Sequence, residues 1–400
     1  MNILILSPNV PSPHSGASTR NYQVLKMLAA KHNCSLLAFQ PNAADKESVI
    51  AAIGQLVSSV HLIPKSEPAK RRQQLVSTLC GKSYTLQSYY RREMQDAIDA
   101  LVAREHYDVV LYESVLMATY RLPQHVKVII DQHNIEFEIR QRTFEAERAL
   151  VRKWYNWLES RHIKAAEIER CRNADTVLVT SEREQRILKR LLPTRVIQVL
   201  PNGVDTKRFQ RDNAFQEVAG RIIFTGSMEY YPNVQAALLF AQRCWPLIRG
   251  QVPTATWQIV GKNPLPEVLK LAELPGVTVT GSVPDMRPYL AQAEVAIAPL
   301  LIGGGTRLKI LEALAMHKAV VSTSLGCEGL DVAPGKHLLV EDQPERFAQA
   351  VLELLLDPQL RVALGNAGRV LVEETYSWEH YRTSLWQAFE AVLAQRKVQA

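Results

Sequence analysis

Short apolar runs separated by helical segments are the feature that most constrains what this 400-residue chain can fold into. The runs are rich in β-branched side chains and nearly continuous, which is typical of parallel strands covered by helices on both faces. The predicted fold class is therefore α/β. Strands are predicted near Ile3–Leu6, Leu36–Phe39, Val60–Ile63, Val109–Tyr112, Val126–Ile130, Val177–Val179, Ile197–Leu200, Ile222–Thr225, Trp257–Val260, Val277–Thr280, Val295–Ala298, Val320–Ser322 and Leu338–Val340.

These strands fall into two groups separated by the turn-forming sequence Pro201-Asn202-Gly203. A polar stretch from Thr206 to Gly220 follows, and the second group starts at Arg221. The chain is also longer than a single hydrophobic core usually organises. We therefore predict two Rossmann-like domains, residues 1–205 and 206–376, and an amphipathic helix in residues 377–400.

Ligands of open parallel sheets bind beyond the carboxyl ends of the strands, so the residues that follow each strand are the candidate site. After the first strand, a loop rich in proline and serine leads through Gly16 into a helix that carries Arg20. Gly16 would let the backbone approach a ligand closely, and Arg20 would reach an anion. An ordinary strand–helix loop is the alternative.

Polar residues follow the predicted strand Val126–Ile130, and Asp131, His133 and Asn134 are the candidates among them. An imidazole at a strand end can hydrogen-bond a sugar or move protons near neutral pH. The alternative is that Asp131 and Asn134 cap the next helix and that His133 lies at the surface.

Consecutive glycines, Gly303–Gly305, follow the predicted strand Val295–Ala298 and lead into a helix near Thr306. Their N–H groups and the helix N-terminus favour an anion there. Arg307 and Lys309 oppose the helix dipole, which suggests that they bind an anion such as a diphosphate.

Glu312 follows one turn later in the same predicted helix and shares a face with apolar residues. A carboxylate there needs polar partners, and the two hydroxyls of a ribose would satisfy it. A pair with Lys309, three residues earlier, is the alternative.

Several other classes of protein are excluded. The chain has no P-loop sequence, no complete dinucleotide fingerprint, and neither an H-E-x-x-H nor a C-x-x-C motif, so no cofactor and no essential protein-bound metal are expected. The five cysteines are scattered, which favours a reduced, cytoplasmic protein. No apolar run of the roughly 18 residues that a span needs is present.

Residues 65–92 are strongly basic and carry interleaved tyrosines. Such a stretch either forms a solvated surface or binds an anionic partner, which is anionic lipid at the inner face of the membrane or an anionic acceptor. No nucleic-acid-binding module is recognised, so nucleic acid is not an expected partner. Residues Glu136–Arg172, expected to form one helix with Trp154 and Trp157 among many charges, are a second candidate for an acceptor or membrane face.

The chain resembles the retaining family 4 glycosyltransferases of GT-B fold over nearly its whole length. The resemblance is carried by Asp131-x-His133-Asn134, by Val199-Leu200-Pro201-Asn202-Gly203-Val204-Asp205, by Phe224-Thr225-Gly226-Ser227-Met228 with Pro232-Asn233, by Gly303-Gly304-Gly305-Thr306-Arg307-Leu308-Lys309 with Glu312-Ala313, and by Gly326-Cys327-Glu328-Gly329 with Gly335-Lys336-His337-Leu338-Leu339-Val340. It implies two parallel-sheet domains that face each other across a cleft, with the last helix crossing back to the first domain.

The resemblance also implies roles for single residues. Glu312 would bind the ribose, Arg307 and Lys309 the diphosphate, and His133 the transferred sugar. The remaining donor contacts would come from Gly16, Gly226, Val283, Gly304, Gly305 and Thr306, and the acceptor side from Arg20, Asp131 and Asn134. The family motif E-x7-E is incomplete, because Gly304 stands where its first glutamate would be.

The implied substrates are a nucleotide sugar, such as a UDP- or GDP-sugar, and a glycan or lipid-linked acceptor. The implied activity is hexosyl or N-acetylhexosaminyl transfer in surface polysaccharide or glycoconjugate synthesis. Two alternatives stay open: a nucleotide-sugar epimerase, and a non-catalytic partner subunit that binds sugar nucleotides.

Overall fold

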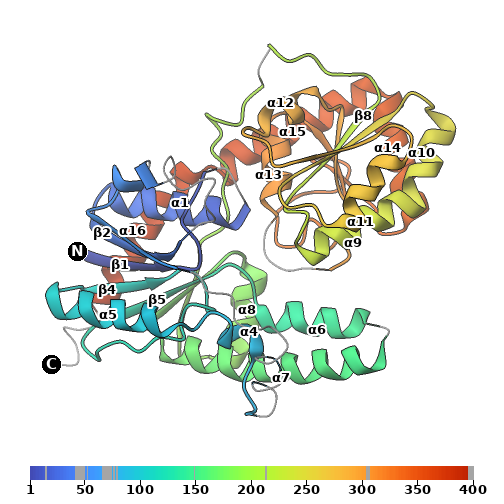
Figure 1. The fold of residues 1–400 in the computed structure, drawn as a ribbon. Helices are drawn as coiled ribbons and strands as arrows, with labels where there is room; N and C mark the ends of the chain where they lie inside the picture. Colours follow the sequence, from blue (N-terminus) through green and yellow to red (C-terminus); the bar gives the residue numbers. More distant parts are fainter. Residues whose placement is uncertain are drawn as a thin grey trace. The chain divides into compact units, whose positions relative to one another are not determined.

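The computed structural model describes residues 1–13, 16–40, 50–51, 53–64, 74, 77, 80–147, 149–211, 214–302 and 307–394. The described residues form two compact units (Figure 1). The first contains Met1–Pro13, the described residues of Ala17–Pro201 and the described residues from Tyr381 onward. The second contains Gly16 and the described residues of Asn202–His380.

The first unit is a seven-stranded parallel sheet with strand order β3-β2-β1-β4-β5-β6-β7. Its strands are β1 (Asn2–Ser7), β2 (Asn33–Phe39), β3 (Ser59–Ile63), β4 (Val109–Tyr112), β5 (Lys127–Gln132), β6 (Thr176–Val179) and β7 (Val196–Val199). Its helices are α1 (Gly16–Ala29), α4 (Tyr84–Gln87), α5 (Arg92–Arg104), α6 (Glu136–Ala146), α7 (Leu150–Asn173), α8 (Glu182–Leu191) and α16 (Trp378–Ala394), whose first residues belong to the second unit.

The second unit is a six-stranded parallel sheet with strand order β10-β9-β8-β11-β12-β13. Its strands are β8 (Arg221–Thr225), β9 (Thr256–Val260), β10 (Val277–Gly281), β11 (Val295–Ala298), β12 (Ala319–Ser322) and β13 (Leu339–Val340). Its helical segments are α9 (Tyr231–Leu239), a π-helical turn (Phe240–Cys244), α10 (Trp245–Gln251), α11 (Pro266–Leu269), a 3₁₀ turn (Lys270–Glu273), α12 (Arg287–Gln292), α13 (Leu308–Ala315), α14 (Pro344–Leu356) and α15 (Pro358–Thr375).

These elements confirm the predicted α/β class with two parallel sheets, and all thirteen predicted strands are present. Strands at the centre of each sheet, such as β4 and β11, have every residue buried because helices cover both faces. The strand order reverses between β1 and β4 in the first unit and between β8 and β11 in the second. These two switch points are where an open parallel sheet binds its ligands.

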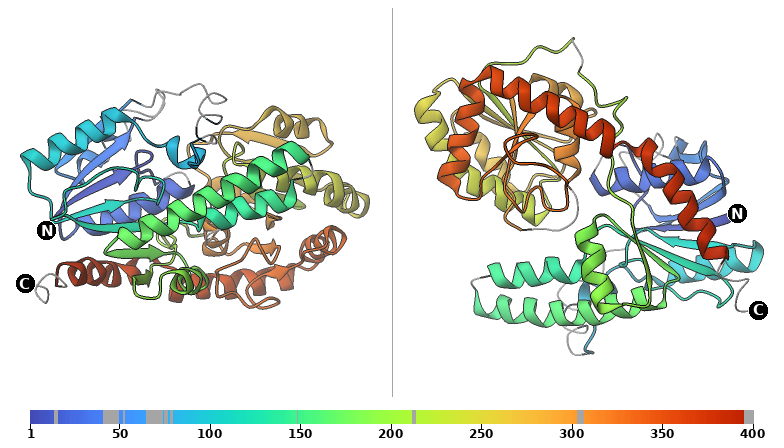
Figure 2. Two further views of the ribbon diagram at one scale, coloured as in Figure 1. Left: turned by 90° about the horizontal axis from the view of Figure 1, so that it is seen from below. Right: turned by 180° about the vertical axis from the view of Figure 1, so that it is seen from behind.

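The expectation of one helix over Glu136–Arg172 is wrong, because α6 and α7 are separate helices packed against each other. Their antiparallel arrangement is visible in both views of Figure 2. The start of α6 is held by the buried carboxylate of Glu167, which accepts hydrogen bonds from the backbone N–H groups of Glu136 (3.0 Å) and Phe137 (2.8 Å). The N-terminus of α6 is therefore bound by a side chain of α7.

Helix α16 packs on α1 of the first unit. The indole Nε1 of Trp386 donates to the carbonyl of Met27 (2.8 Å), and Lys31 forms an ion pair with Glu390 (2.5 Å). The ammonium group of Lys31 also lies 5.0 Å from the centre of the Trp386 ring. The first unit thus includes a helix that the chain supplies about 180 residues after the last strand of that unit.

No helix in the described part of the chain has both the length and the apolar composition needed to cross a lipid bilayer.

Candidate functional site

Lys309 lies at the switch point of the second unit. It is carried by the first turn of α13, just after the segment that follows β11. Its Nζ donates to Oδ1 of Asn233 on α9 (2.8 Å) and lies 4.3 Å from the centre of the Phe224 ring on β8. The ammonium group is therefore placed at the carboxyl edge of the sheet, close to the reversal between β8 and β11.

Gly226 lies beside Lys309 and Asn233. It directly follows β8 and has φ +149°, a conformation that favours glycine. A Cβ there would lie 2.6 Å from Nδ2 of Asn233 and 3.0 Å from Nζ of Lys309. The same Asn233 amide donates to the carbonyl of Ser227 (2.9 Å), which closes the loop after β8. Asn233 thus orients both the loop and Lys309, a role that sequence reasoning missed.

Burial and, to a smaller extent, the nearby charge of Arg307 lower the pKa of Lys309 to about 7, although Glu312 acts in the opposite direction. The ammonium form is therefore poorly compensated by its protein surroundings. An anionic ligand beside Nζ would raise the pKa and favour the charged form.

Glu312 is half-buried one turn along α13. Burial raises the pKa of its carboxyl to about 7, although Lys309 and Arg208 act in the opposite direction. The hydrogen bond of Lys309 Nζ goes to Asn233, whereas Lys309 and Glu312 influence each other's pKa through their charges. Among the described residues no hydrogen-bond donor to the Glu312 carboxylate is found, so this carboxylate is available for a ligand.

The other predicted donor residues are only partly described. Arg307 is the N-cap of α13, and Val283 is half-buried after β10, packed against a core cluster of the second unit. Gly16 is the first residue of α1. Gly304, Gly305 and Thr306 lie outside the described residues, as does most of the basic stretch between positions 65 and 79.

In the first unit, Arg20 and Asp131 form a buried ion pair. Nε of Arg20 lies 2.9 Å from Oδ2 of Asp131 and Nη2 lies 2.6 Å from Oδ1, while Nη1 donates to the carbonyl of Leu200 (3.0 Å). Burial would raise the pKa of Asp131, but Arg20 and His133 outweigh it and hold that pKa well below its usual range. The expectation that Arg20 reaches a ligand anion therefore needs correction, because its guanidinium is occupied by Asp131 and by backbone carbonyls.

His133 and Asn134 follow β5 and are both half-buried. Nε2 of His133 lies 3.5 Å from Oδ2 of Asp131, so the same carboxylate contacts both the guanidinium and the imidazole. The alternative role for Asp131 and Asn134 as helix caps is wrong. The N-cap of α6 is Ile135, without a side-chain cap, and Glu167 binds the first N–H groups instead.

A further carboxylate, Glu113, lies at the switch point of the first unit and was missed from the sequence. It directly follows β4, is fully buried, and precedes Ser114, whose φ of +134° is rare for a residue with a side chain. Burial and the neighbouring Asp131 raise the pKa of Glu113 to about 8, although Ser7, Arg20 and Asn21 lower it. The position of a glutamate after a fully apolar strand was the only sequence signal that could have indicated it.

Replacing Glu113 with glutamine is expected to make the protein more stable than the wild type at pH 8 and nearly equal to it at pH 4. The folded state raises this pKa above 4.5, so the protonated carboxyl contributes stability below pH 4.5 that is lost as the pH rises towards 8. Between pH 4.5 and pH 8, the difference in the free energy of unfolding between Glu113→Gln and the wild type should grow by about 1.4 kcal/mol per pH unit. Thermal unfolding of both proteins over this pH range measures it. The same change at the exposed Glu93 is the control, and parallel profiles for Glu113→Gln and wild type would contradict the assignment.

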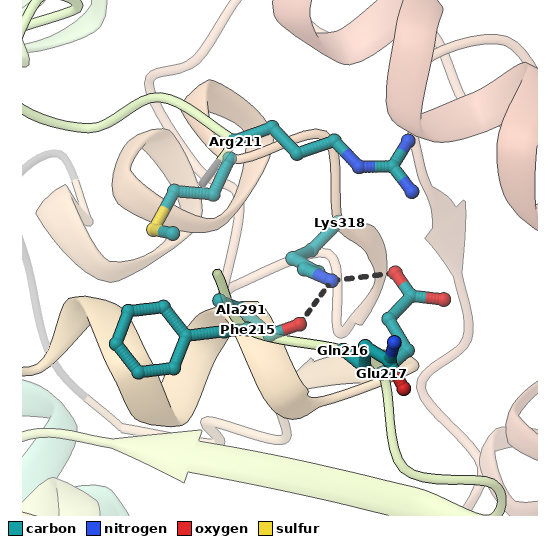
Figure 3. Close-up of a pocket in the computed structure, with 7 residues that line it drawn as sticks. Arg211, Phe215, Gln216, Glu217, Ala291 and Lys318 are labelled. Atoms are coloured by element: carbon teal, nitrogen blue, oxygen red, sulfur yellow. Dashed lines mark hydrogen bonds and ion pairs between the residues drawn. The ribbon is translucent and has the colours of Figure 1, made fainter. Parts of the chain in front are cut away.

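A pocket of about 250 Å³ lies elsewhere in the second unit (Figure 3). Its buried Lys318 donates to Oε1 of Glu217 (2.6 Å) and to the carbonyl of Ala291 (2.8 Å). Lys318 directly precedes β12, so this pocket lies at the amino edge of the sheet, opposite the strand ends that bind ligands. Its residues hold the segment around Glu217 against the unit and are not candidates for the site.

Two units with parallel sheets and polar clusters at their switch points define a GT-B glycosyltransferase architecture, and comparison with known proteins confirms this. The profile described as Glycosyltransferase Family 4 matches residues 14–208, and that described as Glycosyl transferases group 1 matches residues 219–357. The chain belongs to the family 4, group 1 glycosyltransferases.

The chain is also similar to individual proteins, in sequence to the first of those below and in fold to the other two. The chain is 32% identical over 224 residues to a GDP-mannose-dependent alpha-(1-6)-phosphatidylinositol monomannoside mannosyltransferase of Mycobacterium tuberculosis; this match covers 50% of the chain and 57% of the relative. The chain thus spans little more than half the length of that relative. Sucrose-phosphate synthase from Thermosynechococcus elongatus has a TM-score of 0.70 at 17% identity, covering 99% of this chain and 100% of that one. Anabaena HepE in complex with UDP and glucose has a TM-score of 0.70 at 12% identity, covering 98% and 100%.

Proposed function

We propose that the chain transfers a sugar from a nucleotide-diphosphate sugar to an acceptor hydroxyl, with retention of anomeric configuration. The cluster of Gly226, Asn233, Lys309 and Glu312 at the second switch point is the observation that supports this most directly. It presents a cation with a lowered pKa and a carboxylate open to a ligand on the same turn of helix. In this proposal residues 206–376 hold the donor and residues 1–205 hold the acceptor.

The chemistry assigned to these residues is mainly electrostatic. Lys309, with Arg307, stabilises the negative charge that develops on the departing diphosphate. Glu312 accepts hydrogen bonds from the ribose hydroxyls. The acceptor hydroxyl attacks the anomeric carbon on the face from which the nucleotide leaves, and its proton passes to the diphosphate. No protein nucleophile takes part.

His133 contacts the transferred sugar in this proposal. Asp131 fixes the orientation of the imidazole, and Arg20 in turn fixes Asp131. The acceptor is a glycan or a lipid-linked sugar in the synthesis of surface polysaccharide or another glycoconjugate. A GDP-hexose is the first donor class to test, because the M. tuberculosis relative is named for GDP-mannose.

The donor class is tested by thermal unfolding in the presence of GDP-sugars, UDP-sugars, other nucleotide sugars and the free nucleotides. A ligand at about 100 times its Kd stabilises the folded state by about 2.7 kcal/mol, which is readily measured. We expect a large shift with one nucleotide family, and its loss in Glu312→Ala. The control is Glu353→Ala, an exposed glutamate on α14 of the same unit, which should keep the shift.

Three other outcomes would count against the proposal. No shift with any nucleotide removes the donor site. A shift without product, across a panel of lipid and glycan acceptors, supports a non-catalytic partner subunit. Conversion of the donor sugar in the absence of an acceptor supports an epimerase.

A further inference from the structure

The α7 helix of the first unit exposes large apolar side chains that the unit itself does not bury. Leu150 and Val151 are each 83% exposed, Trp154 is 59% exposed and Trp157 is 40% exposed. Among the described residues of this unit, Tyr90 is the only other large hydrophobic residue that is exposed. Isolated exposed hydrophobic residues are ordinary, but a group within eight positions of one helix indicates an interaction site.

The buried side of α7 explains why these residues are not needed for packing. Its buried residues are Glu159, Ile163, Glu167 and Cys171. Glu159 accepts hydrogen bonds from the backbone N–H groups of Tyr84 (3.0 Å) and Thr85 (2.9 Å) at the start of α4, as Glu167 does for α6. The helix thus places carboxylates inside and tryptophans outside, the reverse of an ordinary surface helix.

The exposed side of α7 is also basic. At about 100° per residue, one arc of roughly 80° carries six exposed residues and no acidic residue. We call this set the outer face of α7: Leu150, Trp154, Trp157, Arg161, Lys164 and Arg172. Because Glu159 and Glu167 are turned inward, Glu169 is the one acidic residue of α7 that faces solvent.

The apolar and basic residues of this face contact one another. The guanidinium of Arg161 lies 5.4 Å from the centre of the Trp157 ring. Tryptophan has an apolar body and a polar N–H, so it favours the boundary between lipid head groups and acyl chains. Arginine and lysine at the same level bind anionic head groups, and the combination is typical of helices that lie in a bilayer surface.

We infer that the outer face of α7 docks the protein on an anionic lipid bilayer. Leu150, Trp154 and Trp157 enter the head-group region, and Arg161, Lys164 and Arg172 pair with anionic head groups. The outer face of α7 includes none of the switch-point residues, and the inference does not depend on the proposed transfer reaction. It would hold the first unit beside a lipid-linked acceptor if that acceptor is the substrate.

The test is co-sedimentation of the full chain with vesicles that contain no glycosyl acceptor. One set is phosphatidylcholine alone, and the other is phosphatidylcholine mixed with phosphatidylglycerol. We expect stronger binding to the anionic vesicles, with binding that weakens as salt is added. The double variant Trp154→Ala/Trp157→Ala should bind both kinds of vesicle at least about tenfold more weakly.

A charge variant separates the two contributions. Arg161→Gln/Lys164→Gln should weaken binding to anionic vesicles about fivefold per residue and leave binding to neutral vesicles unchanged. Matched controls are Leu356→Ala/Val362→Ala, exposed hydrophobic residues of the second unit, and Arg104→Gln/Arg190→Gln, exposed basic residues of the first. All substituted side chains are exposed, so thermal unfolding should be unchanged.

Two results would overturn the inference. One is equal binding of the wild type and the tryptophan variant to anionic vesicles. The other is an absence of vesicle binding together with a dimer that Trp154→Ala/Trp157→Ala dissociates, measured by sedimentation velocity, which would assign the outer face to self-association.

Discussion

Replacing Lys309 with methionine should lower kcat/KM for the donor about 100- to 1000-fold, the effect expected when one preorganised charge partner of a transition state is removed. The loss should fall mainly on kcat, because negative charge on the diphosphate is greatest as the sugar–phosphate bond breaks. Methionine keeps the aliphatic stem near Phe224 and Gly226, so the cluster should retain its packing. Steady-state kinetics with the donor identified by thermal shift provide the measurement.

The thermal stability of Lys309→Met shows whether its loss of activity comes from the missing amine or from a loss of folded protein. Burial lowers the pKa of Lys309 to about 7, so the folded state disfavours the ammonium form as the pH falls from 10.5 towards 7. Removing the amine removes that cost, and Lys309→Met should unfold at the same or a higher temperature than the wild type at neutral pH. Lys270→Met, an exposed lysine of the second unit, is the matched control. Unchanged kcat/KM in Lys309→Met would exclude the proposed role.

Replacing Asp131 with alanine should destabilise the first unit by about 3–5 kcal/mol. The substitution leaves the guanidinium of Arg20 buried without its counter-charge, and this penalty is much larger than the net value of an ion pair. Glu390→Ala breaks the exposed pair with Lys31 and should change the stability far less, because an ion pair in contact with solvent contributes little. Chemical denaturation, followed by a probe in each unit, measures both variants.

A double variant tests whether the Arg20–Asp131 pair is required for the fold or for the position of His133. Arg20→Leu/Asp131→Ala removes both charges and should recover most of the stability lost in Asp131→Ala. Activity should stay low, because His133 then lacks the carboxylate that orients it. A double variant as unstable as Asp131→Ala would show that the charge imbalance is not the cause of the loss.

The strands could be predicted from the sequence because a parallel strand covered on both faces must be apolar at nearly every position. The helices were less predictable where tertiary contacts decide their ends. The region between α6 and α7 has no glycine or proline, so local propensity alone favours one helix over Glu136–Arg172. The helix that starts at Glu136 instead ends at Ala146, and α7 starts at Leu150 and packs against α6, so that Glu167 of α7 binds the first N–H groups of α6.

In the candidate site, too, the sequence predicts the features that depend on local residues and misses those that depend on tertiary contacts. The sequence indicates that Arg307 and Lys309 follow a strand and oppose the helix dipole, and that Glu312 shares a helix face with apolar residues, which is local information. The partner of Lys309 is Asn233, 76 positions earlier, and the partner of Arg20 is Asp131, 111 positions later. No local sequence pattern shows which distant residue will be the partner. A basic residue that is expected to bind a ligand can therefore have a protein partner instead. Glu113 was missed because a single glutamate after a strand forms no motif.

The packing of α16 on α1 has a consequence for the order in which the protein is made. Apart from Gly16, the described residues of the second unit lie in one stretch from Asn202 to His380, so they leave the ribosome together. The first unit is translated earlier but lacks α16, so the surface of α1 near Met27 and Lys31 stays uncovered in the meantime. At about 5–20 residues per second, translation of the intervening stretch takes roughly 10–40 s. The first unit can therefore reach its full stability only after α16 has been synthesised.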